Sequence, residues 1–360
     1  MPATVDNDAL HAALESSLQR RFAQRIEEAG AHDPDFAALW RTTAAGAAGG
    51  KLLRPRLLVE TFHELAGDAA SDRAVIDIAT AVELLHCSFL LHDDVIDGDV
   101  LRRGRPNVIG ALGRDVDGDA RSISARAGHW GRSGALLMGD LLLADAVLGF
   151  ARADLPHVAR ARLLIALERV ISETVSGELA DVAFSDGVRT ADLPSILRMT
   201  AGKTAVYSFE LPLRAAAILA DRAPEVEEAL ATCGRSIGLA YQLQDDLLSV
   251  FGDPHAHGKD PLSDLREGKE TAIIAYARMT SAWSSIAPRF GAADLSDADA
   301  VVIRRLLRQC GAETFVDNLV GEHLVAAVSL LDDAVHHGIL PDGARRVLVA
   351  LVARITGRRS

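Results

Sequence analysis

Apolar residues recur at helical spacing along most of the chain. Residues 7–29 place an apolar side chain at every fourth position, which is typical of a helix with one buried face. Residues 72–98 are apolar on every side, so this segment is predicted to be a helix in the middle of a bundle. Both patterns indicate that helices build the core.

Further helices are predicted by the same spacing. They run from Pro34 to about Ala45, from about Lys51, over 133–150 and 163–184, from Pro194, over about 238–252, and repeatedly within 271–357. Gly202 and Thr204 interrupt the helix that opens at Pro194, which predicts a kink. Residues 107–131 are rich in Gly, Asp, Arg and Ser, and this composition predicts a long loop with at most a broken helix.

Composition supports an all-α fold. Hydrophobic residues make up 49% of the chain but aromatic residues only 4%, and the apolar set is mostly Ala and Leu, which favour helix over strand. No linker rich in Pro, Gly or Ser divides the 360 residues, so we expect one domain over 1–360. Within it we expect N-terminal helices over 7–48, the chemical motifs over 49–271 and C-terminal helices over 272–360.

Charge and targeting signals narrow the class of protein. The net charge of −12 argues against a nucleic-acid partner, because phosphate backbones require basic surfaces. Three scattered cysteines without metal-ligand spacing favour a reduced, cytoplasmic environment. The N-terminus lacks the pattern of a signal peptide, and no uninterrupted apolar run approaches the ~18 residues of a membrane span. We therefore expect a cytoplasmic protein without a membrane span.

Candidate chemistry begins at the end of the buried helix. Asp93 and Asp97 are one helical turn apart and share a face, which Asp94 flanks. Carboxylates crowded in this way repel one another unless a positive charge lies among them, and hard oxygen ligands suit magnesium shared with phosphates. Arg102 and Arg103 follow, and guanidinium groups bind phosphate oxygens in pairs. The alternative is an acidic motif on a solvated helix face.

A second acidic pair, Asp245-Asp246, ends another apolar helix. Lys203 at the predicted kink is a candidate phosphate ligand. Glu178 and Asp181 are three residues apart and form either a surface acid pair or part of the same cavity.

Two basic candidates keep an alternative reading. Lys51 and Arg54 mark either an anion site at a helix start or an ordinary basic helix start. His86, two turns before Asp93, is either a hydrogen-bonded core histidine or part of the acidic face.

These pieces, in this order, resemble the trans-isoprenyl diphosphate synthases, or polyprenyl synthetases. The Gly-Gly-Lys-Leu-Leu-Arg-Pro sequence at 49–55 is similar to that family's Gly-Gly-Lys-Arg-x-Arg-Pro, and 93–104 to its first aspartate-rich motif. Lys203-Thr204 and the Tyr-Gln-Leu-Gln-Asp-Asp sequence at 241–246 match its Lys-Thr and second aspartate-rich motif. The resemblance implies an all-helical bundle of the isoprenoid synthase type, with a central active-site cavity.

The resemblance also implies the substrates and the residues that bind them. It implies a magnesium-dependent prenyltransferase that joins isopentenyl diphosphate to an allylic diphosphate (dimethylallyl, geranyl or farnesyl). Asp93, Asp97 and Asp245, helped by Asp94 and Asp246, would hold three magnesium ions. Binding of the allylic diphosphate is assigned to Arg102, Lys203 and Lys259. Binding of isopentenyl diphosphate is assigned to Lys51, Arg54, His86 and Arg103. Thr204 and Gln242 would line the reacting centre, and members are commonly homodimers.

Three positions depart from the family pattern. Leu52 replaces an arginine and removes one possible phosphate contact, and Ser249 stands where the second motif often has its third aspartate. Glu178 stands where many relatives have glutamine, which keeps an oxygen ligand and adds charge.

Product length is expected to depend on the residues before Asp93. In such enzymes these residues form the floor of the channel for the growing tail; the small Ser88 opens it and the ring of Phe89 narrows it. This favours geranylgeranyl diphosphate, with farnesyl diphosphate as the alternative. Two other readings are a terpene cyclase, disfavoured by Asp245-Asp246, and a non-catalytic partner subunit of a prenyl synthase, which Leu52 and Ser249 would support.

Overall fold

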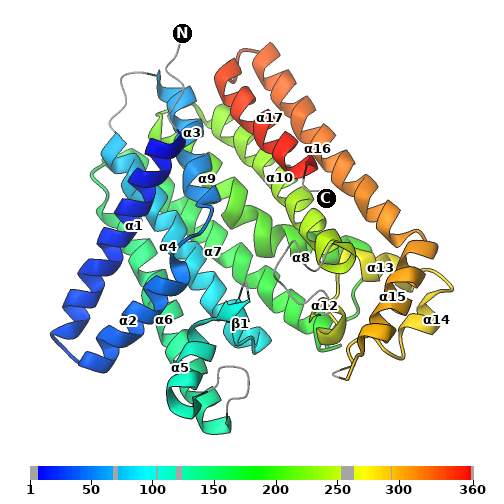
Figure 1. Cartoon of the computed structure of the whole chain (residues 1–360). Helices are drawn as coiled ribbons and strands as arrows, with labels where there is room; N and C mark the ends of the chain where they lie inside the picture. Colours follow the sequence, from blue (N-terminus) through cyan, green and yellow to red (C-terminus); the bar gives the residue numbers. More distant parts are fainter. Residues whose placement is uncertain are drawn as a thin grey trace. The chain divides into compact units, whose positions relative to one another are not determined.

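The computed structural model describes residues 7–67, 72–102, 104–118, 124–252, 263–292 and 294–357. Helices account for nearly all of the regular structure in these ranges (Figure 1), which confirms the all-α prediction. The two strands form one antiparallel pair, with Leu101 opposite Pro106 and Arg102 opposite Arg105. The chain divides into two compact units, residues 1–165 with 218–221 and residues 166–217 with 222–360. The expectation of a single domain over 1–360 stays a prediction.

The first unit is built around α4. Its elements are α1 (Asn7–Gly30), α2 (Pro34–Ala47), α3 (Leu53–Ala66), α4 (Asp72–Asp97), β1 (Leu101–Arg102), β2 (Arg105–Pro106), α5 (Val108–Asp117), α6 (Ala125–Arg152) and the start of α7 (His157–Ser185). Helix α4 packs along α6 and also contacts α3 and α1. Ile78, Val82 and Leu85 on α4 are fully buried, as the all-round apolar pattern predicted.

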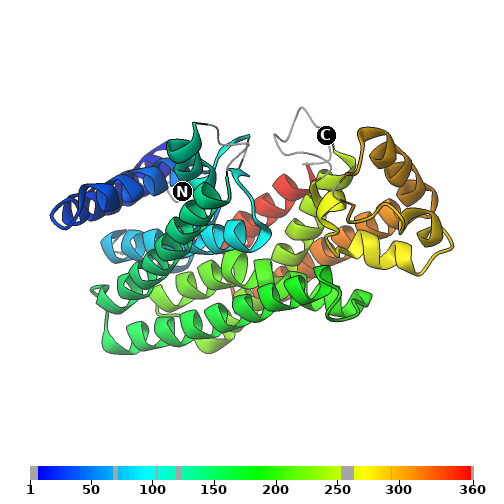
Figure 2. The ribbon, with the colours of Figure 1, turned by 90° about the horizontal axis from the view of Figure 1, so that it is seen from below.

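The second unit is built around α10. It holds the rest of α7, α8 (Leu193–Thr200), the π-helix η2 (Ala201–Glu210), α9 (Leu211–Leu219), α10 (Pro224–Phe251), α12 (Ser263–Glu267), α13 (Ala272–Arg278), α14 (Trp283–Ile286), α15 (Asp297–Gln309), α16 (Ala312–His336) and α17 (Asp342–Thr356). Helix α10 packs along the π-helix and α16 (Figure 2). The kink expected at Gly202 and Thr204 is a stretch of π-helix, and the chain stays helical from α8 through α9.

The loop expected at 107–131 is wrong, because this segment contains α5 and the first turns of α6. Two of the glycines that indicated a loop are packing positions inside helices. A Cβ on Gly110 would lie 2.1 Å from the carbonyl oxygen of Val100, and one on Gly131 would lie 2.6 Å from that of Ile109. Glycine is needed here because backbones approach closely, and not because the chain turns.

Three of the described helices are long and apolar enough to cross a membrane by length and composition alone: Arg73–Asp97, Ala125–Arg152 and Ala312–His336. In the first, 67% of the most apolar window is buried inside the protein, so burial in the core accounts for its apolar character. The expected absence of a membrane span stays a prediction.

Candidate active site

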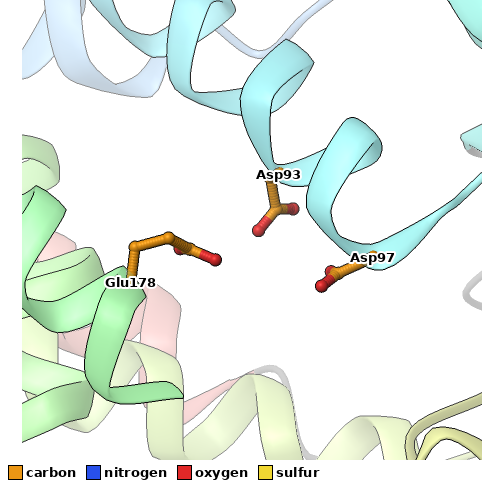
Figure 3. A group of neighbouring side chains, drawn as sticks. All are labelled: Asp93, Asp97 and Glu178. Carbon is orange, nitrogen blue, oxygen red and sulfur yellow. The ribbon is translucent and has the colours of Figure 1, made fainter. Parts of the chain in front are cut away.

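The first acidic motif occupies the last turns of α4. Asp93 and Asp97 lie one turn apart, and Figure 3 shows both carboxyl groups on the same side of the helix. One carboxylate oxygen of Asp93 lies within 4.8 Å of one carboxylate oxygen of Asp97. Carboxylate oxygens are the hard donors that magnesium prefers in proteins. The chemistry of Asp93 and Asp97 therefore fits a magnesium ion.

Arg102 folds back onto this motif from β1. It donates from Nε (3.0 Å) and Nη2 (2.6 Å) to Oδ1 of Asp94, and from Nη2 to Oδ2 of Asp93 (3.2 Å). The reversal of the chain is made at Gly104, whose φ of 71° lies in the left-handed region that glycine adopts readily. The base expected to bind phosphate is thus held by two of the acids expected to bind metal.

Asp94 is more deeply buried than Asp93 and Asp97, since only 3% of its surface is exposed. Burial raises the pKa of the Asp94 carboxyl to about 6, although the charge and hydrogen bonds of Arg102 act in the opposite direction. Arg103, predicted to bind isopentenyl diphosphate, lies outside the described residues.

The residues before the motif pack against α6. The Ser88 hydroxyl is buried and donates to the carbonyl oxygen of Gly139 (2.8 Å). A Cβ on Gly139 would lie 2.4 Å from Nε2 of His92, so the two helices touch at this level. Ser88 therefore faces a helix–helix contact, while Phe89 and His86 on α4 are half-buried.

Lys51 and Arg54 lie on either side of the start of α3. Lys51 is exposed and Arg54 is half-buried in the first turn. Leu52 between them has a left-handed backbone (φ 47°, ψ 40°) and is 5% exposed, because its side chain turns inward. It lines a mostly apolar cavity of about 180 Å³ with residues of α1 and α2. Position 52 is therefore an apolar packing position in this chain, which suits leucine.

Lys203 is held by the acid pair of α7. Its Nζ lies 2.9 Å from Oε2 of Glu178 and 2.7 Å from Oδ2 of Asp181. Both carboxylates are at least half-buried, so the interpretation as a surface acid pair is wrong. Lys203 and Thr204 occupy the first turn of the π-helix, and both are half-buried.

The second acidic motif lies near the end of α10. Asp246 is buried and accepts a hydrogen bond from Nε2 of Gln242 (2.9 Å), while Asp245 is half-buried. Burial raises the pKa of the Asp246 carboxyl to about 7, while the charge of Lys269 lowers it. Gln242, predicted to line the reacting centre, thus also orients an acid of the motif.

Two residues that sequence reasoning missed lie beside this motif. The Ser249 hydroxyl donates to Oδ2 of Asp264 (2.6 Å), so a carboxylate from α12 stands next to the position that lacks the third aspartate. Burial would lower the pKa of Lys269, but the charges of Asp264, Asp181 and Asp246 outweigh it and raise the pKa. No spacing in the sequence links these residues to α10. Lys259, predicted to bind the allylic diphosphate, lies outside the described residues.

Known proteins match this chain over most of its length. The polyprenyl synthetase family matches residues 40–292. A (2E,6E)-farnesyl diphosphate synthase of Mycobacterium tuberculosis is 33% identical over 290 residues, 78% of this chain and 73% of the relative. A geranylgeranyl diphosphate synthase of Methanosarcina mazei is 31% identical over 310 residues, 85% of each chain. The crystal structure of a geranylgeranyl pyrophosphate synthase from Corynebacterium glutamicum, complexed with isoprenyl diphosphate and magnesium, superimposes with a TM-score of 0.85 at 29% identity, over 96% of this chain and 99% of that one.

Proposed function

We propose that this chain, a prenyltransferase that belongs to the polyprenyl synthetase family, condenses isopentenyl diphosphate with an allylic diphosphate to make geranylgeranyl diphosphate. Short-chain prenyl diphosphate synthesis is common to the relatives, whereas their products differ: one makes farnesyl and another geranylgeranyl diphosphate. The observation that carries the proposal is the pair Asp93 and Asp97 on one face of α4, with Arg102 beside it. An acid pair for a metal and a base for a phosphate on one short stretch suit a diphosphate leaving group.

The chain's own residues would bind the two substrates and exclude water. Asp93, Asp97 and Asp245 would hold magnesium, with Asp94 and Asp246 in support, and magnesium when bound neutralises the charge that develops on the leaving diphosphate. Arg102, Lys203 and Lys259 would bind the allylic diphosphate. Isopentenyl diphosphate would be bound by Lys51, Arg54, His86 and Arg103.

The half-buried side chains around the reacting centre have a separate task. Cleavage of the carbon–oxygen bond of the allylic substrate leaves a carbocation that water would destroy. Thr204 and Gln242 would shield it until the double bond of isopentenyl diphosphate attacks. The released diphosphate can take the final proton, so the proposal needs no dedicated protein base.

The product assignment rests on Phe89 and Ser88. Phe89 lies one turn before Asp93, is half-buried, and in a tail channel would act as the floor. Because Ser88 is committed to Gly139 on α6, Phe89 is the stronger candidate for this role. A single ring at the floor favours geranylgeranyl over longer products, with farnesyl diphosphate as the alternative.

We further propose a cytoplasmic homodimer without a membrane span. The dimer is supported by an exposed apolar stripe on α6, in which Trp130, Leu137 and Leu141 recur at helical spacing and Leu137 is 58% exposed. Leu137→Glu is expected to convert the dimer to a monomer in light-scattering measurements on the purified protein. A monomeric wild type would contradict this part of the proposal.

One incubation tests the proposed activity. Purified protein, magnesium and isopentenyl diphosphate are mixed with dimethylallyl, geranyl or farnesyl diphosphate in turn, and the products are identified by mass. Geranylgeranyl diphosphate is the expected product. Failure to condense with any primer would refute the enzyme proposal and favour a partner subunit, while a cyclic hydrocarbon formed without isopentenyl diphosphate would favour a terpene cyclase.

A further inference from the structure

Lys203 lies in an unusual helix. Between Ala201 and Glu210 the chain continues helically from α8 to α9 but with π-helical hydrogen bonding. Most π-helical segments are single-turn bulges inside α-helices, and they are frequent at functional sites. A ten-residue run departs from the preferred α-helical geometry over several turns. Contacts with its neighbours must therefore hold it in this register.

Two neighbouring helices touch the backbone of the π-helix. A Cβ on Gly177 of α7 would lie 2.3 Å from the backbone nitrogen of Lys203. A Cβ on Gly238 of α10 would lie 2.7 Å from Cα of Ala205. The main chain of Lys203 therefore rests directly on α7, and any change in the spacing of these helices moves it.

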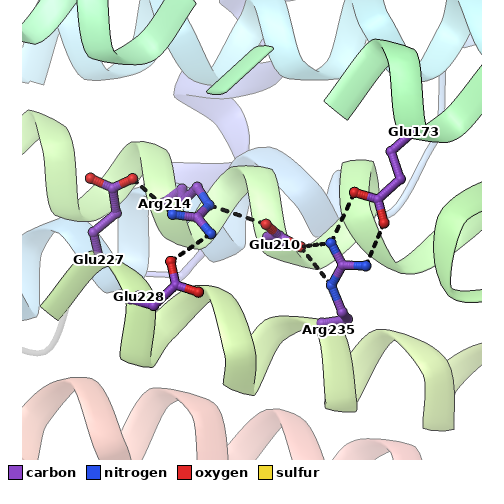
Figure 4. Close-up of polar contacts among 6 residues, drawn as sticks. All are labelled: Glu173, Glu210, Arg214, Glu227, Glu228 and Arg235. Atoms are coloured by element: carbon purple, nitrogen blue, oxygen red, sulfur yellow. Dashed lines mark hydrogen bonds and ion pairs between the residues drawn. The ribbon is translucent and has the colours of Figure 1, made fainter. Parts of the chain in front are cut away.

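At the far end of the π-helix, a buried glutamate pairs with a half-buried arginine. Glu210, the last residue of the π-helix, is only 2% exposed. It accepts from Nε of Arg235 on α10 (3.0 Å) and from Nε of Arg214 one turn later (3.1 Å). Arg235 also donates to both carboxylate oxygens of Glu173 on α7, with Nη2 3.0 Å from Oε2. Figure 4 shows Arg235 between the two glutamates, so one guanidinium joins three helices.

This arrangement connects the end of the π-helix with the turn of α7 that holds Lys203. Glu173 lies one turn before Gly177, and its carbonyl oxygen lies 3.3 Å from the position of a Cβ on Gly202. Gly177 in turn precedes Glu178 and Asp181, which bind the Lys203 ammonium. Because Arg235 contacts carboxylates on two different helices, these ion pairs fix how the π-helix and α7 lie against α10.

We propose that Glu210, Arg235 and Glu173 are positioning residues, which hold the π-helical register that aims Lys203 at the allylic diphosphate. The inference rests on the proposed function, because it takes Lys203 to be a diphosphate ligand. The Lys203 ammonium itself is bound by Glu178 and Asp181. The three positioning residues act on Lys203 through the backbone of the π-helix and through the spacing of α7 and α10.

Glu210→Gln tests the proposal, because it keeps the shape of the side chain and removes its charge. We expect kcat/KM for the allylic diphosphate to fall about ten-fold, since small misplacements of a substrate ligand are costly. KM for isopentenyl diphosphate is expected to stay the same. Glu228→Gln is the matched control: Glu228 belongs to the same network and binds Arg214, but its side chain is 67% exposed and it does not contact Arg235 or the π-helix. The control should behave as wild type.

A double-mutant cycle separates positioning from general damage. In the Lys203→Ala background, Glu210→Gln should cause no further loss of kcat/KM, because the group that it positions is gone. Losses that multiply, or equal changes in KM for both substrates, would overturn the proposal. If Glu210→Gln does not fold, Arg235→Lys replaces it, since lysine keeps the charge but loses the two-pronged contact with Glu173.

A measurement without substrate keeps the inference distinct from the proposed function. Backbone amide hydrogen exchange over 201–210 should be faster in Glu210→Gln than in wild type and unchanged in Glu228→Gln. A wild type that condenses nothing would refute the proposed function. Hydrogen exchange alone would then decide whether Glu210 stabilises the π-helix. An unchanged exchange rate in Glu210→Gln would overturn the inference.

Discussion

Replacing Arg102 with alanine should destabilise the protein in a pH-dependent manner. Arg102 makes three hydrogen bonds to the carboxyl groups of Asp93 and Asp94, and Asp94 is almost fully buried. Without the guanidinium, the Asp94 carboxyl must either remain charged in an apolar site or take up a proton. Proton uptake is the cheaper response, because the pKa of Asp94 is already about 6.

The pKa sets the size of the effect. Folding raises the Asp94 pKa, so in wild type this group lowers stability as the pH rises to about 6 and has no further effect above that. In Arg102→Ala the folded pKa is higher still, so the decline continues beyond pH 6. Between pH 6 and pH 8 the free energy of unfolding of the variant goes on falling by about 1.4 kcal/mol per pH unit, while that of wild type stays level. The variant is therefore less stable than wild type by about 3 kcal/mol at pH 8 but by only a few tenths of a kcal/mol at pH 5.5.

Urea unfolding in magnesium-free buffer at pH 5.5 and pH 8 measures this difference. Arg105→Ala is the control, because Arg105 lies opposite Arg102 in the same strand pair but is exposed. The control should change the free energy of unfolding by less than about 0.5 kcal/mol at either pH. An Arg102→Ala loss of equal size at both pH values would show that the ionisation of Asp94 is not what Arg102 stabilises.

Three further changes have definite expected outcomes. Asp97→Asn should lower kcat at least about 100-fold without unfolding the protein, because it removes a proposed metal ligand from an exposed carboxyl position; a near-normal rate in the primer assay would contradict that role. Ser249→Asp places a second carboxylate beside Asp264, so thermal unfolding should occur at a lower temperature without magnesium, and magnesium should stabilise the variant more than wild type. Phe89→Ala should lengthen the product and Ser88→Tyr should shorten it; mass analysis that finds unchanged products would remove both residues from the channel floor.

The helical elements could be predicted where periodicity alone decides the structure. The pattern over 72–98 predicted a buried helix, and most of α4 is buried because it packs along α6 and also contacts α3 and α1. The pattern over 107–131 failed because glycine has two uses. Gly110 and Gly131 allow backbones to touch, and this use depends on how the segments that hold Val100 and Ile109 pack against them, which the glycine positions alone do not reveal.

The π-helix shows the same limit of prediction from sequence. Gly202 and Thr204 predicted a kink, and the structure has a π-helical segment at this place instead. Its form could not be predicted, because Gly177 and the Glu210–Arg235–Glu173 contacts that support it come from other helices. Asp264 was not predicted for the same reason, because it contacts Ser249 from α12 and the sequence between them has no regular spacing.

The candidate site shows why residue types can be predicted more easily than their partners. The sequence assigned acids to metal and bases to phosphate, each to its own ligand. The structure instead joins Arg102 to Asp93 and Asp94, two acids assigned to metal, and joins Lys203 to Glu178 and Asp181, which the sequence had left without a ligand. An unpaired charge is costly in a half-buried site, so without ligands each base pairs with the acids beside it. If these acids bind magnesium and these bases bind diphosphate, as proposed, each ligand frees the groups that bind the other, so we expect each to strengthen the binding of the other.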